Sequence, residues 1–249
     1  MAAKKTATKT ATQQTASNDD RADARRQALV KAFREHGDDV TALAQQKYMK
    51  STMPFYGLPK PLRSALTKPV FEATPPMDHD DWLTTAQHLW RTATHREQWY
   101  AALHWTSLKA STSWQTPATM ALYDELIVTS SWWDIVDEVA SNRVGTLLVR
   151  FEPQLKSLML QYAIDDQIWR RRTAIICQLG RKDAIDLELL TTCIRPSLGR
   201  REFFLRKAIG WALRQTARHH PDWVVSYVDE HHDDLSPLSR REALKHLAT

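Results

Sequence analysis

Residues 130–139 of the chain read SSWWDIVDEV. If Ser130 or Ser131 is the N-cap of a helix that begins at Trp132, apolar side chains recur at the i, i+3, i+4 and i+7 positions. These positions are Trp132, Ile135, Val136 and Val139. The spacing is typical of a helix with one buried face, so the stretch predicts a helix in an α-helical core.

Trp133 and Asp137 lie outside this apolar stripe. Successive residues on a helix point about 100° apart, and residues four apart stack on one side. The indole and the carboxylate are therefore expected to share a face that the core does not need. Two interpretations are open at this point. Either Trp133 packs on a neighbouring helix while Asp137 pairs with an arginine, or the two side chains belong to a functional site.

The rest of the chain after about residue 20 has the same helical character, with almost no strand-like alternation. Breaks that contain proline or glycine separate segments of about 10 to 20 residues, a typical helix length. Ala followed by Leu or Ile recurs after an aromatic residue at Ala102, Ala174 and Ala208, with spacings of 174 − 102 = 72 and 208 − 174 = 34. Helical-pair repeats have periods of roughly 34 to 47 residues, so the pattern favours an all-α solenoid.

The first 20 residues differ from the rest. MAAKKTATKTATQQTASN contains lysine but no acidic residue and has no apolar periodicity. This composition predicts a disordered basic tail over residues 1–20, followed by a single domain over residues 21–249.

Composition narrows the classes of protein to consider. The 249 residues include only 6 glycines, which disfavours a glycine-rich nucleotide-binding fold, and the net charge of +5 leans toward a polyanionic partner. Two cysteines, Cys177 and Cys193, are too few for a disulfide framework and are expected in the core. No apolar run approaches the roughly 20 residues of a membrane span, and no signal sequence is evident, so a cytoplasmic location is expected.

Metal and cofactor sites are not predicted. No Walker loop, GxSxG motif or cysteine-rich zinc pattern is present. The paired histidines His219-His220 and His231-His232 point apart on a helix, unlike an i, i+4 metal pair.

A cation interrupts the apolar face of residues 168–179, IWRRRTAIICQL. On a helical wheel Arg172 falls among the apolar residues, whereas Arg170 and Arg171 fall outside and are predicted to be surface charges. A buried arginine needs an anion. Its partner is either Asp137, in a buried ion pair, or a phosphate group, which the planar guanidinium suits.

Residues 201–215, REFFLRKAIGWALRQ, place Trp211 at the edge of an apolar arc. Lys207 and Arg214 follow beside it, and Gly210 is expected on the same outward side, where a ligand could approach. Residues 151–220 hold 13 basic and 7 acidic residues, a net charge of 13 − 7 = +6. A basic stripe with a border tryptophan is a reasonable surface for nucleic acid, although border tryptophans also occur on ordinary amphipathic helices.

Several long blocks together resemble the AlkD-type alkylpurine DNA glycosylases. They are KYMKSTMPFYGL, ELIVTSSWWDIVD, IWRRRTAI, REFFLRKAIGWALR and LSPLSRREALKHL, in the order of that family and spanning about residues 48–247. The resemblance implies a right-handed superhelix of HEAT-like repeats with duplex DNA on a concave basic face. It also implies excision of N3- or N7-alkylated purines without a metal. We expect no other cofactor and no membrane partner, and nothing in the sequence suggests more than a monomer.

The resemblance assigns roles residue by residue. Trp133 and Asp137 match the tryptophan and aspartate of the SWWD block, Arg172 the arginine of the IW block, and Trp211 the tryptophan of KAIGW. Tyr48 matches a DNA-contacting tyrosine, and Lys50, Lys207 and Arg214 are further expected DNA contacts. Pro59 stands where some members have a glutamine near the lesion strand, so that contact is in doubt.

The implied chemistry is hydrolysis of an N-glycosidic bond, in which Asp137 stabilises positive charge on the sugar and positions water. Trp133 and Trp211 would offer π faces to that charge, and Arg172 would hold a phosphate. The alternatives are a non-catalytic helical-repeat scaffold that binds DNA or protein and, less favoured, an RNA-binding repeat protein. Neither alternative explains why Trp133, Asp137, Arg172 and Trp211 occur together.

Overall fold

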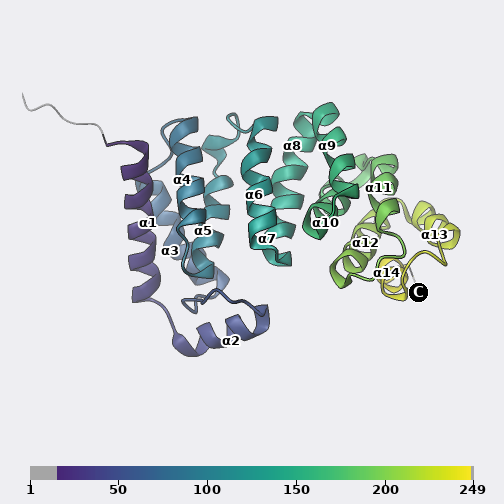
Figure 1. The fold of residues 1–249 in the computed structure, drawn as a ribbon, viewed down its shortest axis with the longest axis horizontal. Coiled ribbons are helices and arrows are strands. Elements are labelled where there is room, and N and C mark those ends of the chain that lie inside the picture. The colour runs from purple at the N-terminus through teal and green to yellow at the C-terminus, as the bar shows by residue number, and fades with distance from the viewer. Residues whose placement is uncertain (1–15, 248–249) are drawn as a thin grey trace, which may run out of the picture. The chain divides into compact units, whose positions relative to one another are not determined.

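The computed structural model describes residues 16–247, which are helical with connecting turns and contain no strand (Figure 1). The chain divides into two compact units, residues 1–102 and 103–249, each described separately below. The all-helical fold class is confirmed, and it is consistent with an α-solenoid. The handedness, the concave basic face and the single domain stay predictions.

The first unit is built from long helices. Their bounds are α1 (Asn18–Glu35), α2 (Asp39–Met49), α3 (Lys60–Ala73), α4 (His79–Arg91) and α5 (Arg96–Thr106), the last of which crosses the unit boundary. Ser17 caps α1 in a capping box with Asp20, so the final residues of the predicted tail are helical. Residues 1–15 of that tail lie outside the described residues.

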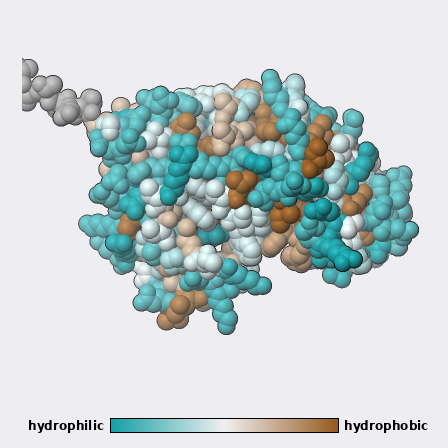
Figure 2. All heavy atoms as spheres, in the orientation of Figure 1, coloured by the Kyte–Doolittle hydropathy of each residue, from teal (hydrophilic) through white to brown (hydrophobic). Residues whose placement is uncertain are grey.

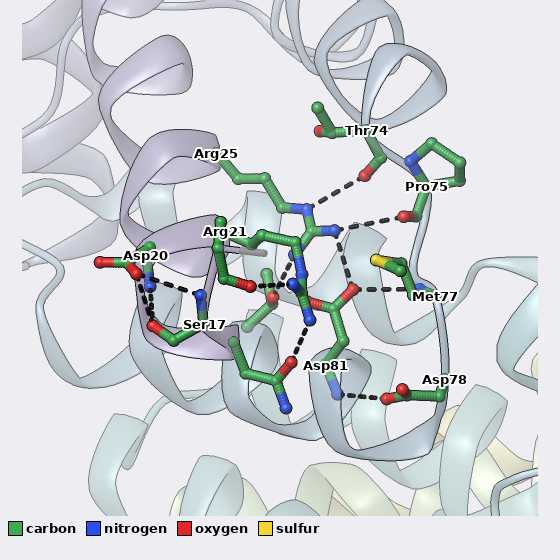
Figure 3. Close-up of polar contacts among 12 residues, drawn as sticks. Ser17, Asp20, Arg21, Arg25, Thr74, Pro75, Met77, Asp78 and Asp81 are labelled. Carbon is green, nitrogen blue, oxygen red and sulfur yellow. Dashed lines mark hydrogen bonds and ion pairs between the residues drawn. The ribbon is translucent and has the colours of Figure 1, made fainter. Parts of the chain in front are cut away.

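A buried ion pair joins α1 to α4 in this unit (Figure 3). Arg25 Nη1 and Nη2 donate to Asp81 Oδ1 and Oδ2 at 2.8 and 2.9 Å, and Arg25 Nε donates to the carbonyl of Thr74 at 3.0 Å. Burial opposes ionisation of Asp81, but hydrogen bonds from Arg25, the Met77 amide and Arg21 outweigh it and hold its pKa below the ordinary value. The side chains are 2% and 0% exposed, so this pair fixes the register of the two helices.

The second unit is a succession of shorter helices. Its α-helices are α6 (Met120–Ser130), α7 (Trp133–Glu138), α8 (Gly145–Arg150), α9 (Glu152–Ile164), α10 (Ile168–Ile176), α11 (Leu187–Ile194), α12 (Phe203–Thr216), α13 (Pro221–Glu230) and α14 (Pro237–Ala243). A π-helix, η3 (Val139–Val144), joins α7 to α8, and the 3-10 turns are η1 (Lys109–Ser111), η2 (Pro117–Thr119), η4 (Lys182–Ala184) and η5 (Arg195–Ser197).

Contacts in this unit run between near neighbours in sequence. α9 packs on α10 and α11, α10 on α11 and α12, and α12 on α13 and α14. Such local stacking is typical of helical-repeat folds. The core includes Ile176 and Ile194 at 0% exposure, and Cys177 and Cys193 are buried free thiols, as predicted. No helix of the described residues has the length and apolar character needed to cross a membrane.

The start of the α7 helix differs from the prediction. Ser130 ends α6, and Ser131 is the C-cap of α6 with a left-handed backbone (φ 44°), so neither serine caps α7. Trp132 occupies the N-cap position without a side-chain hydrogen bond. The two helices are too close in sequence for a separate polar cap. The rest of the stripe is confirmed, because Ile135, Val136 and Val139 are all 0% exposed.

α12 and α14 approach closely at Gly210, which is buried. A Cβ on Gly210 would lie 2.6 Å from Glu242 Cβ and 3.0 Å from the carbonyl oxygen of Ser239. The prediction that Gly210 faces outward toward a ligand is wrong. A wheel drawn on α12 alone cannot show that α14 covers this position.

We expect Gly210→Ala to destabilise the protein although alanine favours helices. Overpacking typically costs about 1–3 kcal/mol and the gain in helix propensity is about 1 kcal/mol, so the net loss is up to about 2 kcal/mol. Gly180→Ala is the matched control, because nothing lies within 4 Å of a Cβ there. The measurement is the free energy of unfolding in urea, and a Gly210→Ala variant at least as stable as Gly180→Ala would contradict the packing described.

Candidate active site

The residues of the site come from α7, α10 and α12 in the second unit. Trp133 begins α7, and Asp137 follows one turn later. The π-helix η3 starts two residues after Asp137, and the Ser141 hydroxyl donates to the Asp137 carbonyl. π-helical turns are rare and occur frequently at functional sites.

Arg172 on α10 pairs with Asp137 through two hydrogen bonds. Arg172 Nε donates to Asp137 Oδ1 at 2.7 Å, and Nη2 donates to Oδ2 at 2.8 Å. The remaining nitrogen, Nη1, donates to the carbonyl of Phe204 at the start of α12 at 2.6 Å. The arginine side chain is 4% exposed and the aspartate side chain 15%. Of the two partners considered for Arg172, the structure therefore shows Asp137.

Burial and charge act on Asp137 in opposite directions. Burial raises the pKa of the Asp137 carboxyl above its ordinary value, and the Arg172 hydrogen bonds and charge offset part of that rise, while nearby Asp134 adds to it. The Arg172 guanidinium thus favours the anionic form of a carboxyl group that burial disfavours. An anion of this kind acts strongly on positive charge that develops beside it.

Arg170 and Arg171 do not behave alike. Arg171 is buried, and its Nη1 donates to the carbonyl of Pro196 at 2.9 Å, so its prediction as a surface charge is wrong. Its guanidinium reaches backbone carbonyls at helix ends, which are acceptors that a sequence does not display. Arg170 is partly exposed and makes a second two-bond pair, with Asp124, at 2.8 and 2.6 Å.

An aromatic cluster supports the Phe204 end of the site. The rings of Trp132 and Trp169 lie 5.3 and 5.0 Å from the ring of Phe204 between centroids. These contacts fix the segment whose carbonyl receives Arg172. The role of this carbonyl was not predicted. The only signal for it in the sequence was the two adjacent phenylalanines, Phe203 and Phe204.

Trp211 lies half-buried on α12 and packs against the core. Lys207 Nζ and Arg214 Nη1, one turn to either side, bind the two oxygens of Glu242 on α14 at 2.9 and 2.5 Å. The basic face predicted around Trp211 therefore contains an acidic residue, which the periodicity of α12 does not reveal because it lies 28 residues beyond Arg214. Among the described residues, neither Trp133 nor Trp211 makes a hydrogen bond or ring contact with Asp137 or Arg172.

The other predicted contacts belong to the first unit. Tyr48 is 76% exposed near the end of α2, and Lys50 follows as its left-handed C-cap (φ 48°). Val40 and Leu43 on the same helix are 78% and 69% exposed, and Figure 2 shows hydrophobic atoms where Figure 1 places α2. Pro59 precedes α3 at its N-cap position without a side-chain hydrogen bond.

Among the described residues, histidine, cysteine and acidic side chains do not gather into a possible metal site. Within residues 16–247, no group of three or more of these side chains is placed to hold an ion.

Comparisons with known proteins place these residues in a family. A family model described as "DNA alkylation repair enzyme" matches residues 29–247, which include all the site residues above. A solved structure described as a "Predicted DNA alkylation repair enzyme from Enterococcus faecalis" is similar, with 29% identity and a TM-score of 0.77, over 86% of this chain and 97% of that one. No curated protein matches the sequence. Since the family match spans most of the sequence, the chain belongs to the DNA alkylation repair enzyme family.

Proposed function

We propose that this protein is a monofunctional DNA glycosylase that acts as a monomer on duplex DNA. It hydrolyses the N-glycosidic bond of N3- or N7-alkylated purines and leaves an abasic site. The observation that carries the proposal is the Asp137–Arg172 pair, because it pairs a partly exposed carboxylate with a buried cation in a DNA alkylation repair protein.

Alkylation at N3 or N7 makes the purine a cation and hence a good leaving group. When the C1′–N bond breaks, the purine takes the bonding electrons and positive charge develops on the deoxyribose, as in other glycosidic cleavages. Asp137 stabilises that charge and positions a water molecule, whose oxygen forms the new bond to C1′ as a proton is lost. The π faces of Trp133 and Trp211 add attraction for the cationic sugar.

Arg172 acts in this proposal through Asp137. Its three guanidinium nitrogens already donate to the carboxylate and to the Phe204 carbonyl, and its side chain is 4% exposed. This favours a positioning role over the phosphate contact that the family resemblance suggested. Contacts with the DNA backbone fall to the exposed residues Tyr48 and Lys50 and to Lys207 and Arg214.

We expect Asp137→Asn to slow release of N7-methylguanine from duplex DNA by about 10²–10³-fold, because the stabilising charge is lost. Asp124→Asn is the matched control, since it breaks the other two-bond arginine pair of the same unit. The measurement is single-turnover release of the free base. Equal losses in both variants would indicate a structural effect, and a rate in Asp137→Asn close to that of the wild type would contradict the assigned role.

The pH dependence of Arg172→Gln separates the two roles considered for Arg172. Activity requires ionised Asp137 and falls as pH drops through its pKa. Arg172 lowers that pKa, so its removal raises it further, and activity should be lost at a higher pH than in the wild type. The rate of base release is measured against pH, with Arg170→Gln as the control.

A phosphate contact by Arg172 would produce a different result. The acid limb of the pH profile would stay in place in Arg172→Gln, and the salt dependence of duplex binding would weaken by a slope of about 0.9.

A further inference from the structure

Glu242 on α14 is an acidic residue that lies between two cations of α12, Lys207 and Arg214. Its two carboxylate oxygens are divided between Lys207 and Arg214, at 2.9 and 2.5 Å. The carboxylate is 13% exposed, whereas the side chains of Lys207 and Arg214 are 40% and 20% exposed. The hydrogen bond from Lys207 holds the pKa of Glu242 below its ordinary value despite partial burial, so the carboxylate is ionised at neutral pH.

The backbone brings Glu242 to this position through Gly210. Because Gly210 has no side chain, α14 can approach α12 until Glu242 lies directly over it. Lys207, Trp211 and Arg214 are spaced four and three residues apart, so they share the side of α12 beside that approach. Glu242 of α14 therefore contacts both Lys207 and Arg214 beside Trp211.

Lys207, Arg214 and Glu242 together carry a net charge of +1, whereas the two cations alone would carry +2. Lys207 has three N–H donors and remains partly exposed, so it can reach a second anion. A DNA phosphate that approaches this face meets cations already bound to a carboxylate, and it must compete with that carboxylate for them. The competition weakens attraction to any duplex, whether or not it carries a lesion, because phosphates are present in both.

We propose that Glu242 is a positioning residue for DNA binding that competes with phosphodiester groups for Lys207 and Arg214 and limits non-specific affinity. This inference rests on the proposed action on duplex DNA. Glu242 sets how many phosphates the Trp211 face engages, and it orients both cations in the absence of DNA.

The test is the salt dependence of binding to an undamaged duplex by the full chain, for wild type and Glu242→Gln. Glu230→Gln is the matched control, because it makes the same change in net charge at an exposed position on α13. We expect Glu242→Gln to bind roughly tenfold more tightly, as for one new charge-assisted hydrogen bond. Its plot of log affinity against log salt should be steeper by about 0.9 for each added phosphate.

Glu230→Gln should leave the slope unchanged. In a Lys207→Gln, Arg214→Gln background, Glu242→Gln should have no effect on the slope, because the cations that it would release are gone. If Glu242→Gln does not fold, Glu242→Asp replaces it, since its shorter side chain cannot hold both cations as Glu242 does, and the same direction of change is expected.

An unchanged slope in Glu242→Gln, with only a lower melting temperature, would overturn the inference and leave a purely structural ion pair. Equal changes in Glu242→Gln and Glu230→Gln would also overturn it, since net charge alone would then account for them. Base release by the wild type is scored separately. If the wild type releases alkylated base and Glu242→Gln keeps the wild-type salt slope, only the inference about Glu242 is contradicted. If the wild type does not bind duplex DNA, both this inference and the proposed function are contradicted.

Discussion

The charge of Arg172 inside an apolar helix face is the constraint on which the site of the second unit depends. A buried guanidinium without an anion costs several kcal/mol. Asp137 supplies that anion through two hydrogen bonds, and the Phe204 carbonyl accepts from the remaining nitrogen. The Arg172 side chain on α10 therefore bonds to both α7 and α12. Loss of either set of hydrogen bonds would leave a buried polar group unsatisfied, so the three helices keep a single arrangement.

The same bonds prepare Asp137 for chemistry on a glycosidic bond. The Arg172 guanidinium uses one lone pair on each oxygen of the Asp137 carboxylate. An ionised carboxylate has about four lone-pair positions that accept hydrogen bonds, so about two remain available. The 15% of the side chain that is exposed gives access to that capacity. Partial burial also removes water that would screen the charge. Arg172 neutralises the charge of Asp137 but leaves part of its carboxylate exposed. This arrangement is consistent with a carboxylate that attracts the positive charge on the deoxyribose.

Periodicity predicted the helices that carry the site, because the apolar spacing near Ile135, near Ile175 and near Leu205 is a property of each helix by itself. It also identified Asp137 as an available partner for Arg172, since a cation in an apolar stripe requires an anion. What it missed depends on neighbouring helices. Three such features arise from packing between segments. α14 covers Gly210, Glu242 binds Lys207 and Arg214, and Arg171 is buried against backbone carbonyls. The π-helix after Asp137 likewise has no signature in residue spacing.

The most direct test of the account is product analysis after the wild-type protein acts on a duplex that carries a single N7-methylguanine. We expect free N7-methylguanine in stoichiometric amount, and a DNA strand that is intact except for one abasic site, both detected by mass spectrometry. A duplex that is bound but retains its base, with an N3-methyladenine duplex equally unchanged, would contradict the account. The protein would then be a binding module on the same helical scaffold.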